Sequence, residues 1–454
     1  MCATDKSTVR RQAPSKPLLT REQITDRVDK GETLVIIHNK IYNLTKWIKY
    51  HPGGDLPIKH LTGKDATDAF LAFHPLWVID KKLPHFHIAD VHPDSRRTTK
   101  ISVAYRKLET QLQAEGWYNT NYWFFAREVL KFLCMWAGMV YLAVWGPKHW
   151  LSYTVSALLG ASLWHQAAFV AHDAGHSGIS HDAKIDTTFG VCLGNFLGGL
   201  SLGWWKHNHN VHHIVTNDPE HDPDIQHVPF FAVSARFLNN LYSSYYNRVM
   251  EFDAAARFFI PVQHYLYYIV LCFGRFNLYV LSWQHLLSSR QVPLRALEIT
   301  GLCTFWVWYL AMLSQLPSWG WVAFYVALSH MATMFLHLQI TLSHFGMGTE
   351  NPPGEEEFAA MGLRTTMDIE CPRWMDWFHG GLQYQVEHHL FPRIPRHNLR
   401  KLQPIIKQFA KDHGLPFHSY GFIRSNGLVL DALKDVADQI ANVLRVDPKT
   451  VHMH

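Results

Sequence analysis

Two pairs of long apolar segments dominate the pattern of hydrophobic and polar positions along the chain. Residues 129–145 and 150–171 form the first pair, and residues 297–316 and 319–342 form the second, each pair joined by a short turn. A helix of about 20 apolar residues is long enough to cross the hydrocarbon core of a bilayer. The pattern therefore predicts an α-helical membrane protein with four transmembrane helices arranged as two hairpins.

The distribution of charge predicts the orientation of these helices. The two hairpin tips hold a single basic residue, Lys148, whereas the long connecting segments hold many lysines and arginines. By the positive-inside rule, the connecting segments are expected on the cytosolic side. Residues 260–287 are also apolar, but Arg275 and Asn277 would be costly at the centre of a bilayer. We expect this segment to lie in the membrane plane, to re-enter, or to form a kinked pair.

The N-terminal part of the chain has the pattern of a small α+β domain. Residues 1–18 are polar and are expected to form a disordered arm. Residues 33–37 and 40–44 read as two short strands around a two-residue turn. Residues 96–128 are charged and helix-prone, and they end in aromatic residues typical of a membrane interface, so we expect a linker or interfacial segment there.

The composition agrees with a membrane protein that also carries polar domains. Aromatic residues make up 14% and charged residues only 17%, while the mean hydropathy is -0.09, as expected if polar domains dilute a membrane core. A net charge of +5 is too mild to indicate a nucleic-acid partner, and positive charge near lipid is the simpler interpretation. The six cysteines form no C-x-x-C pair, which argues against a disulfide framework or thiolate zinc. The first residues lack an apolar signal core, so no cleaved secretory signal is expected.

Three short histidine clusters lie near the ends of the apolar segments or between them. The first pairs His172 with His176, the second joins His209, His212 and His213, and the third repeats the second spacing with Gln385, His388 and His389. Positions i, i+3 and i+4 share one face of a helix. Neutral imidazole suits zinc, copper, iron and nickel, so the clusters indicate a transition-metal site. One histidine pair is common by chance, but three clusters in such a chain predict the ligand set of one metal centre.

The number of imidazoles favours two metal ions over one. Seven or eight imidazoles exceed the three or four ligands of a zinc site. His344, at the cytosolic end of the fourth apolar segment, is the best additional ligand, whereas core or substrate-tunnel roles are expected for His330 and His337. The H-E-x-x-H motif of metalloproteases is missing, and only Asp173 and Glu387 could supply carboxylates, too few for a carboxylate-rich di-iron site.

A further histidine pair lies in the N-terminal domain. His51 begins the sequence H-P-G-G-D, which alone would indicate a Pro-Gly turn. With the two strands before it, Trp47 just upstream and His74 downstream, residues 19–95 resemble the cytochrome b5 family. The resemblance implies that His51 and His74 are the axial ligands of haem b. A haem with both axial positions filled transfers electrons and has no site for oxygen.

The three clusters together resemble the histidine boxes of the membrane fatty-acid desaturase superfamily. The fused cytochrome b5 domain, and Gln385 in place of the first histidine of the third box, resemble the front-end branch of that superfamily. The resemblance runs from residue 19 to about residue 430, with the membrane domain at 129–430 and a C-terminal helix and tail at 431–454. It implies a cap of histidine boxes that holds two non-haem iron ions, with O2 as co-substrate, and the removal of two hydrogens from an unactivated methylene pair.

The same resemblance implies the ligands and the partners. The ligands carried over are His172, His176, His209, His212, His213, His388 and His389, with His344 as an extra ligand and Gln385 as a weaker one that acts through its amide oxygen or through water. Two electrons per turnover would come through the haem, reloaded by NADH-cytochrome b5 reductase. The implied location is the endoplasmic reticulum membrane, with several crossings and with the haem domain and the histidine boxes on the cytosolic side.

Around the third box the chain is most similar to Δ8 sphingolipid desaturases. The similarity lies in residues 365–369, 378–385, 390–392 and 395–400. It implies ceramide or another lipid as the substrate, with a double bond inserted into the long-chain base. A front-end Δ6 or Δ5 fatty-acyl desaturase shares the boxes and stays an alternative, as do a lipid hydroxylase, a membrane cytochrome without catalytic activity and a metal transporter.

Two features after the third box predict surface roles. Arg393, Arg396, Arg400 and Lys401 are expected first to form a face for anionic headgroups, and second to contact substrate. Residues 428–444 have the pattern of an amphipathic helix, which is expected to pack against the body.

Overall fold

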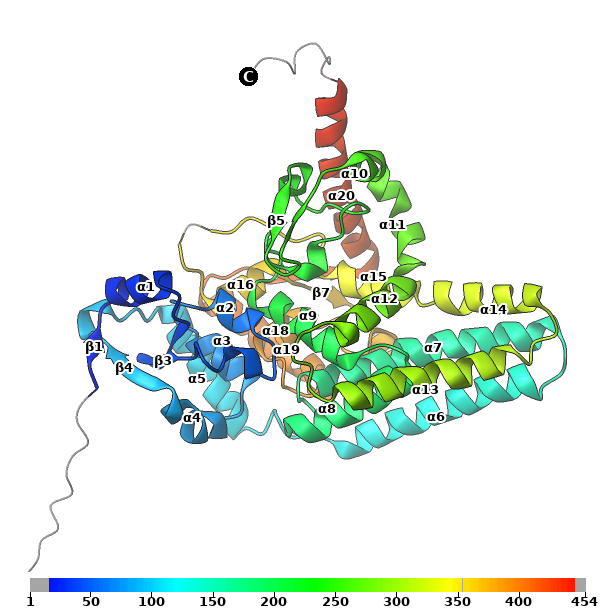
Figure 1. The fold of residues 1–454 in the computed structure, drawn as a ribbon, viewed down its shortest axis with the longest axis horizontal. Helices are drawn as coiled ribbons and strands as arrows, with labels where there is room; N and C mark the ends of the chain where they lie inside the picture. Colours follow the sequence, from blue (N-terminus) through cyan, green and yellow to red (C-terminus); the bar gives the residue numbers. More distant parts are fainter. Residues whose placement is uncertain (1–15, 353, 446–454) are drawn as a thin grey trace, which may run out of the picture.

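Three regions make up the molecule. The computed structural model describes residues 16–352 and 354–445 of the chain, so most of the arm expected at residues 1–18 and the last part of the tail expected at 431–454 lie outside the described residues. A small α+β domain (blue, at the left of Figure 1) lies at one end, and a group of long helices extends at the other. An irregular cap joins them at the centre.

A four-stranded sheet organises the N-terminal domain. The strands are β1 (Leu18–Leu19), β2 (Leu34–Ile37), β3 (Lys40–Asn43) and β4 (His87–Val91). Their order is β1-β4-β3-β2, with β1 parallel to β4 and the other pairs antiparallel. His38 and Asn39 form the β2–β3 turn, both with the positive φ that tight hairpins need. The two predicted strands are confirmed, and Leu18, expected in the arm, belongs to the sheet.

Side chains of the sheet pack on both of its faces. Four helices surround the sheet, namely α1 (Arg21–Asp29), α2 (Leu56–His60), α3 (Thr67–Phe73) and α4 (Trp77–Lys81). Ile36 and Ile41 pack into one core, while Val35 and Tyr42 pack into a second, because successive side chains of a strand point to opposite faces. The second core extends to Phe70 of α3, so it supports the helix that ends just before His74.

Helix α5 (Lys100–Ala114) connects this domain to the rest and is itself part of a core. Its Tyr105 is buried, stacks on Phe391 with ring centroids 5.2 Å apart, and donates a hydrogen bond of 2.7 Å to the carbonyl of Leu390. Ser102 donates to the carboxylate of Asp68 in α3 at 2.6 Å. The helix expected within residues 96–128 is present, and it fixes the N-terminal domain against the segment of the third histidine cluster.

Four long helices extend side by side from the cap (Figure 1). They are α6 (Tyr122–Val144), α7 (Trp150–Gly175), α13 (Arg295–Leu313) and α14 (Trp319–Met331), the last continued by α15 (Met334–Leu342). Their shared core contains Phe132, Trp164, Phe305 and Tyr325. Ser156 of α7 donates to the Met139 carbonyl of α6 at 2.6 Å, so the first hairpin is joined by a buried hydrogen bond as well as by packing.

Within the described residues, two helices are long and apolar enough to cross a membrane, Arg295–Leu313 and Trp319–Leu342, and a bent pair would make a third. These two helices form the second predicted hairpin. Helix α6 begins at Tyr122 rather than at residue 129, and its first turns carry Arg127, Glu128 and Lys131. Because polar side chains lower the hydropathy of the first hairpin, crossing by α6 and α7 stays a prediction.

The segment at residues 260–287 is a bent pair of helices. Residues Ala254–Leu271, which include α10 (Ala254–Phe259) and α11 (Gln263–Leu271), meet α12 (Gly274–Leu287) at 79°. Arg275 is buried, with its guanidinium 4.0 Å from the ring centre of Trp164 and its Nε donating to the Tyr279 hydroxyl at 2.8 Å. The bend fits the expected re-entrant or kinked segment, and the arginine is shielded by aromatic rings rather than exposed to lipid.

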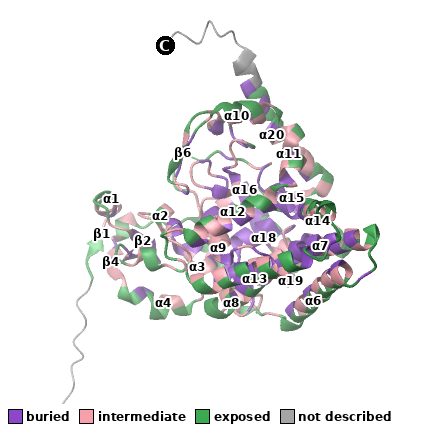
Figure 2. Ribbon diagram, turned by 45° about the vertical axis from the view of Figure 1, so that its right-hand side comes forward, coloured by how far each residue is buried: buried purple, intermediate pink, exposed green. Residues whose placement is uncertain are grey.

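The cap is built from helices of different lengths and short strands around the histidine clusters. The helices are α8 (Ala183–Val191), α9 (Leu202–Ile214), α16 (Phe358–Thr365), α17 (Asp376–His379), α18 (Gln385–Leu390), α19 (Arg396–Asp412) and α20 (Phe422–Arg445), and the strands are β5 (Leu241–Ser243), β6 (Arg248–Met250), β7 (Met367–Glu370) and β8 (His418–Gly421). Figure 2 shows α18 largely buried at the centre of the molecule, with exposed residues toward the periphery. This burial keeps the third cluster away from bulk water.

Helix α20 packs against the α10–α11 region. Val429, Leu433, Val436 and Ile440 of this helix join a core with Tyr267 of α11. The amphipathic helix expected at residues 428–444 is confirmed. It begins earlier, at Phe422, and therefore runs across the domain boundary expected at residue 430.

Candidate metal centres

The first two histidine clusters lie on helices that pack closely together. His172 is in the last turn of α7, with His176 directly after it, and the second cluster is on α9. A Cβ atom at Gly175 would lie 2.0 Å from the indole of Trp205 in α9. The glycine in H-D-A-G-H is therefore needed for the two helices to approach, which brings the first cluster against the second.

Four histidines from all three clusters form one group. One ring nitrogen from each of His172, His176, His209 and His388 lies within 4.8 Å of the others. The Nε2 atom of His213 lies 3.1 Å from Nε2 of His209 and 3.1 Å from Nε2 of His388. Two nitrogens that each bind one ion at about 2 Å are separated by about 3 Å, so this spacing is that of ligands around a shared metal ion.

Three other histidines form a second group beside the first. Ring nitrogens of His212, His344 and His389 lie within 4.8 Å of one another, and all three residues are buried. His344 follows α15, so the end of the fourth apolar segment brings it to this group, and its ligand role stays a prediction. The ring of His213 stacks on that of His389 with centroids 4.1 Å apart and thereby lies between the two groups. Each of the two groups could therefore supply ligands to its own ion.

Several buried ring nitrogens in these groups have no hydrogen-bond partner among the described residues. They are Nε2 of His172, both ring nitrogens of His176, Nδ1 of His213, Nδ1 of His344 and Nε2 of His389. A buried polar atom without a partner destabilises the folded protein, commonly by about 1–3 kcal/mol. Metal coordination would satisfy such nitrogens, and the donor set of neutral imidazoles suits iron.

Two aspartates complete the surroundings of the second cluster, and the sequence analysis did not identify them. Nδ1 of His212 lies 2.9 Å from a carboxylate oxygen of Asp222, and Asp224 lies 3.7 Å from Nδ1 of both His209 and His212. Burial lowers the pKa of His212, but the two carboxylates outweigh burial and raise it to about 8. The Asp222 contact holds a proton on Nδ1, so a metal ion would displace the other proton and bind at Nε2. The sequence feature that could have identified these aspartates is the short D-P-D sequence that follows the second box.

Gln385 lies at the start of α18, one turn before His388 and His389. Its side chain is buried, and no hydrogen bond from it is found within the described part of the chain. Its ligand role therefore stays a prediction. His330 has a core role, as expected, because its ring stacks on Phe276 with centroids 4.7 Å apart and its Nδ1 lies 2.9 Å from the Val326 carbonyl.

Two of the four basic residues after the third box do not lie on the expected surface face. Arg393 and Arg396 are buried, and Arg396 pairs with Asp173 at 3.3 Å and with Glu128 at 3.2 Å. Arg400 pairs with Asp376 of α17. The expectation of a headgroup-binding face is therefore wrong for Arg393 and Arg396, and it stays a prediction for the partly exposed Arg400 and the exposed Lys401. A buried guanidinium needs carboxylate partners, and here those partners come from the first box and from α6.

The N-terminal domain holds the second candidate cofactor site, between His51 and His74. Their ring centroids lie 5.9 Å apart, with 38° between the planes. Nδ1 of His51 donates to the Gly54 carbonyl at 2.7 Å, and Nδ1 of His74 donates to the Phe70 carbonyl at 3.0 Å. Both Nε2 atoms are thereby left as ligands, and burial lowers the pKa of His74 to about 3, which keeps its imidazole neutral. The pair fits an iron bound from two sides.

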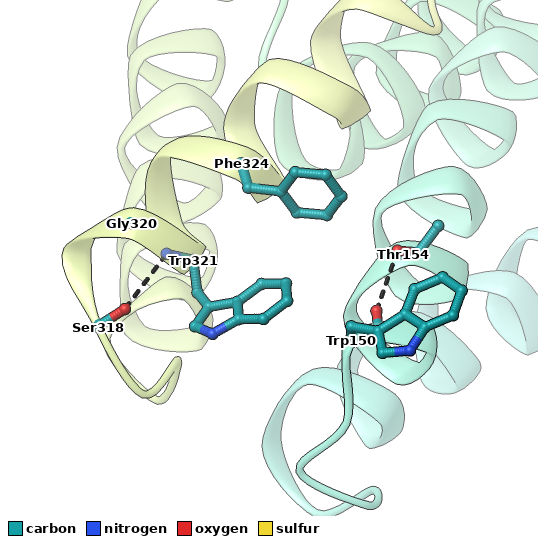
Figure 3. Close-up of a pocket in the computed structure, with 6 residues that line it drawn as sticks. All are labelled: Trp150, Thr154, Ser318, Gly320, Trp321 and Phe324. Atoms are coloured by element: carbon teal, nitrogen blue, oxygen red, sulfur yellow. Dashed lines mark hydrogen bonds between the residues drawn. The ribbon is translucent and has the colours of Figure 1, made fainter.

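An open groove lies between the two hairpin tips. Figure 3 shows Trp150 and Thr154 of α7 across from Trp321 and Phe324 of α14, around a cavity of about 410 Å³. Trp150 and His172 are at opposite ends of α7, about 33 Å apart at 1.5 Å per residue. This groove is therefore separate from the histidine groups and does not belong to the metal site.

Two family models match the chain. The model described as fatty acid desaturase matches residues 148–421, which include all three histidine clusters. The model described as cytochrome b5-like haem/steroid binding domain matches residues 20–92, which include His51 and His74.

Relatives with both parts match over nearly their whole length. A Delta 8-(E)-sphingolipid desaturase of Emericella nidulans is 38% identical, over 93% of this chain and 95% of the relative. A protein of the same name from Kluyveromyces lactis is also 38% identical, over 94% of each chain. A Delta(8)-fatty-acid desaturase 1 of Arabidopsis thaliana is 38% identical, over 94% of this chain and 95% of the relative.

Proposed function

Because the chain belongs to the fatty acid desaturase family and carries a cytochrome b5-like domain, we propose that it inserts a Δ8 double bond into the long-chain base of a sphingolipid. Membership makes the chain a membrane-bound oxidoreductase. The two family matches together imply that it uses haem, iron and O2. The observation that carries the proposal is the position of Nε2 of His213, which lies 3.1 Å from Nε2 of His209 and 3.1 Å from Nε2 of His388.

The proposed ligands divide between two ions. His172, His176, His209 and His388 would hold one ion, and His212, His344 and His389 would hold the other, with His213 between them. Gln385 would be a weaker ligand through its amide oxygen or through water. Iron bound there supplies the oxidising chemistry: one O2, two electrons and two protons remove two hydrogens from adjacent methylenes, and two waters are released.

The protein's own residues prepare the centre for this reaction. Asp222 and Asp224 orient the imidazoles of the second box, and the buried positions of α9 and α18 exclude water. Electrons would enter through haem b held by His51 and His74, whose Nδ1 atoms are fixed by backbone carbonyls. The proposed electron donor to the haem is NADH-cytochrome b5 reductase.

The membrane arrangement is part of the proposal. We propose that α6, α7, α13 and the α14–α15 pair all cross the bilayer, with the histidine groups and the haem domain in the cytosol at the endoplasmic reticulum. Exposed Tyr122 and Trp123 lie at one end of α6, and Trp145 at the other is 70% exposed, a spacing of about 33 Å at 1.5 Å per residue. Aromatic residues at both ends support a crossing despite the polar first turns of α6.

Lipid analysis tests the proposal. The chain would be expressed in a host that makes ceramides without Δ8-unsaturated bases, beside the ligand variant His212→Ala as the inactive control. We expect Δ8-unsaturated long-chain bases with the unaltered protein and none with the variant. New double bonds in fatty acids alone would favour the acyl alternative, to which the Arabidopsis relative's name points. A hydroxylated base would instead identify a hydroxylase, and no change in any lipid would contradict the proposal.

A further inference from the structure

The haem domain is docked with its ligand loops on the second histidine box. Asn210, between the ligand positions of α9, donates a hydrogen bond of 3.2 Å to the carbonyl of Gly53 in the H-P-G-G turn. Leu56 of α2 packs against Val211 of α9 and Tyr245. A Cβ atom at Gly53 would lie 3.3 Å from the Asn210 amide and 2.9 Å from the ring of His51, so the close approach of the two segments favours glycine there. The haem site therefore directly adjoins the helix of the second box.

One aromatic ring lies between the two cofactor sites. Phe73, the last residue of α3, immediately precedes the haem ligand position His74. Its ring centroid is 5.6 Å from that of His213, with the planes at 85°, and 6.3 Å from that of His176. Such edge-to-face pairs are favourable contacts between rings. Phe73 is thus one peptide unit from a haem ligand and in contact with two proposed iron ligands.

We propose that Phe73 is the bridge through which electrons pass from the haem to the histidine-bound iron, an inference that rests on the function proposed above. In each transfer the haem iron is oxidised from ferrous to ferric and the non-haem centre gains one electron. Two transfers supply the two electrons of one turnover, with O2 as the final oxidant. No bond at Phe73 forms or breaks, because the ring serves only as the medium for the electron.

The physical reason is the steep fall of electron tunnelling with the width of unbonded gaps. The path from His74 to Phe73 is covalent, and the single gap from Phe73 to His213 is a van der Waals contact between two π systems. An aliphatic side chain at position 73 would keep the covalent part of the path. It would widen the gap to His213 or weaken the electronic coupling across that gap. The ring could instead shield the histidine-bound iron from water, and this role makes a different prediction. Loss of the ring would then increase the release of peroxide and leave the rate of electron transfer unchanged.

Stopped-flow spectroscopy of the full-length protein, loaded with haem and iron, separates these roles. The haem is reduced without oxygen by dithionite, excess reductant is removed, and the protein is mixed with O2 and substrate while the haem absorbance is followed. We expect Phe73→Leu and Phe73→Met to slow haem oxidation about tenfold or more, equivalent to about 1.4 kcal/mol in activation free energy. The haem spectrum, the haem potential and the iron content should stay as in the unaltered protein.

Aromatic substitutions and a matched control complete the test. Phe73→Tyr or Phe73→Trp should restore most of the rate, and Trp77→Leu, which removes a half-exposed aromatic residue of α4 in the same domain, should leave it unchanged. Oxidation rates are measured only on protein that holds both haem and iron, so incomplete cofactor loading does not affect them. Oxidation of both aliphatic variants at the unaltered rate would overturn the proposal, as would fast oxidation accompanied by increased peroxide release. Failure of the proposed function is distinct, since the unaltered protein would then yield no unsaturated product.

Discussion

The Nδ1 atom of His212 lies 2.9 Å from a carboxylate oxygen of Asp222, and both groups are almost completely buried. A carboxylate in this position fixes the orientation of the ring, and it would make the imidazole a stronger ligand for the proposed iron. The same carboxylate accepts a hydrogen bond of 2.7 Å from the backbone N–H of Asn217. Asp222 therefore links the second box to the backbone that follows it.

Replacing Asp222 should weaken iron binding without affecting the haem. Asp222→Asn keeps the shape but removes the charge, and loss of such a partner typically lowers metal affinity or activity about 10–100-fold. Iron per chain, measured by elemental analysis against a chelator series, should fall accordingly. Asp253→Asn, at the start of α10, is the matched control because its side chain caps a helix away from the histidines. Unchanged iron affinity in Asp222→Asn would contradict the assignment.

Ligand substitutions should separate the two cofactors. His51→Ala or His74→Ala should abolish the haem spectrum and leave the non-haem iron in place, because the haem pair and the histidine groups use different side chains. His212→Ala should do the reverse, and all three variants should form no unsaturated product. Absorption spectroscopy and elemental analysis on the same samples provide the check. Full activity in His212→Ala would disprove the metal assignment.

Docking of the haem domain should weaken as the pH falls below neutrality. The ring of His60 in α2 lies 4.7 Å from that of His221, and burial, followed by the nearby His221 and Lys64, lowers the pKa of His60 from 6.5 to about 4, against an opposing effect of Asp218. A histidine with a lowered pKa takes up its proton more readily in the undocked state. The docked state therefore loses stability as the pH falls from about 6.5 toward about 4, with no effect of this group above that window.

Limited proteolysis of the segment between the haem domain and α5 measures this effect. Cleavage should become faster across the same pH window and change little between pH 7 and 8. His60→Gln keeps a polar side chain but removes the titration, so its cleavage should depend less on pH. An identical pH profile in this variant would show that another group controls docking.

Removing Arg396 should destabilise the cap. Its guanidinium is buried between Asp173 and Glu128, and loss of one partner from such a pair commonly costs about 3–5 kcal/mol because the remaining charges stay buried. Arg396→Ala should therefore lower the thermal unfolding temperature in detergent. Arg373→Ala, at an exposed position, should have little effect. Equal unfolding temperatures for the two variants would count against a structural role for Arg396.

The sequence predicted the features that depend on local spacing. His209, His212 and His213 share a helix face because positions i, i+3 and i+4 of an α-helix lie on one side, and α9 has that geometry. The hairpin around His38 and Asn39 depends on an equally local pattern. Such features do not require knowledge of the partners that the rest of the chain supplies.

Features that depend on distant partners could not be predicted in this way. A run of basic residues reads as a surface, and only the fold shows that Asp173 and Glu128 meet Arg396. The role of Asp222 depends on a turn that returns the chain to His212. The contact between Phe73 and His213 joins two domains, and no periodicity in either domain indicates it.

The docking contact that includes the hydrogen bond between Asn210 and Gly53 would also affect how the rate of the proposed electron supply depends on protein concentration. A haem domain docked on its acceptor would make each transfer from haem to acceptor a first-order event, whose rate does not depend on the concentration of the protein in the bilayer. The concentration of the protein in the membrane would then affect only the encounter with the reductase that reduces the haem again. Whenever reduction of the haem is fast, the turnover rate per molecule would be the same at low and at high concentration of the protein in the membrane.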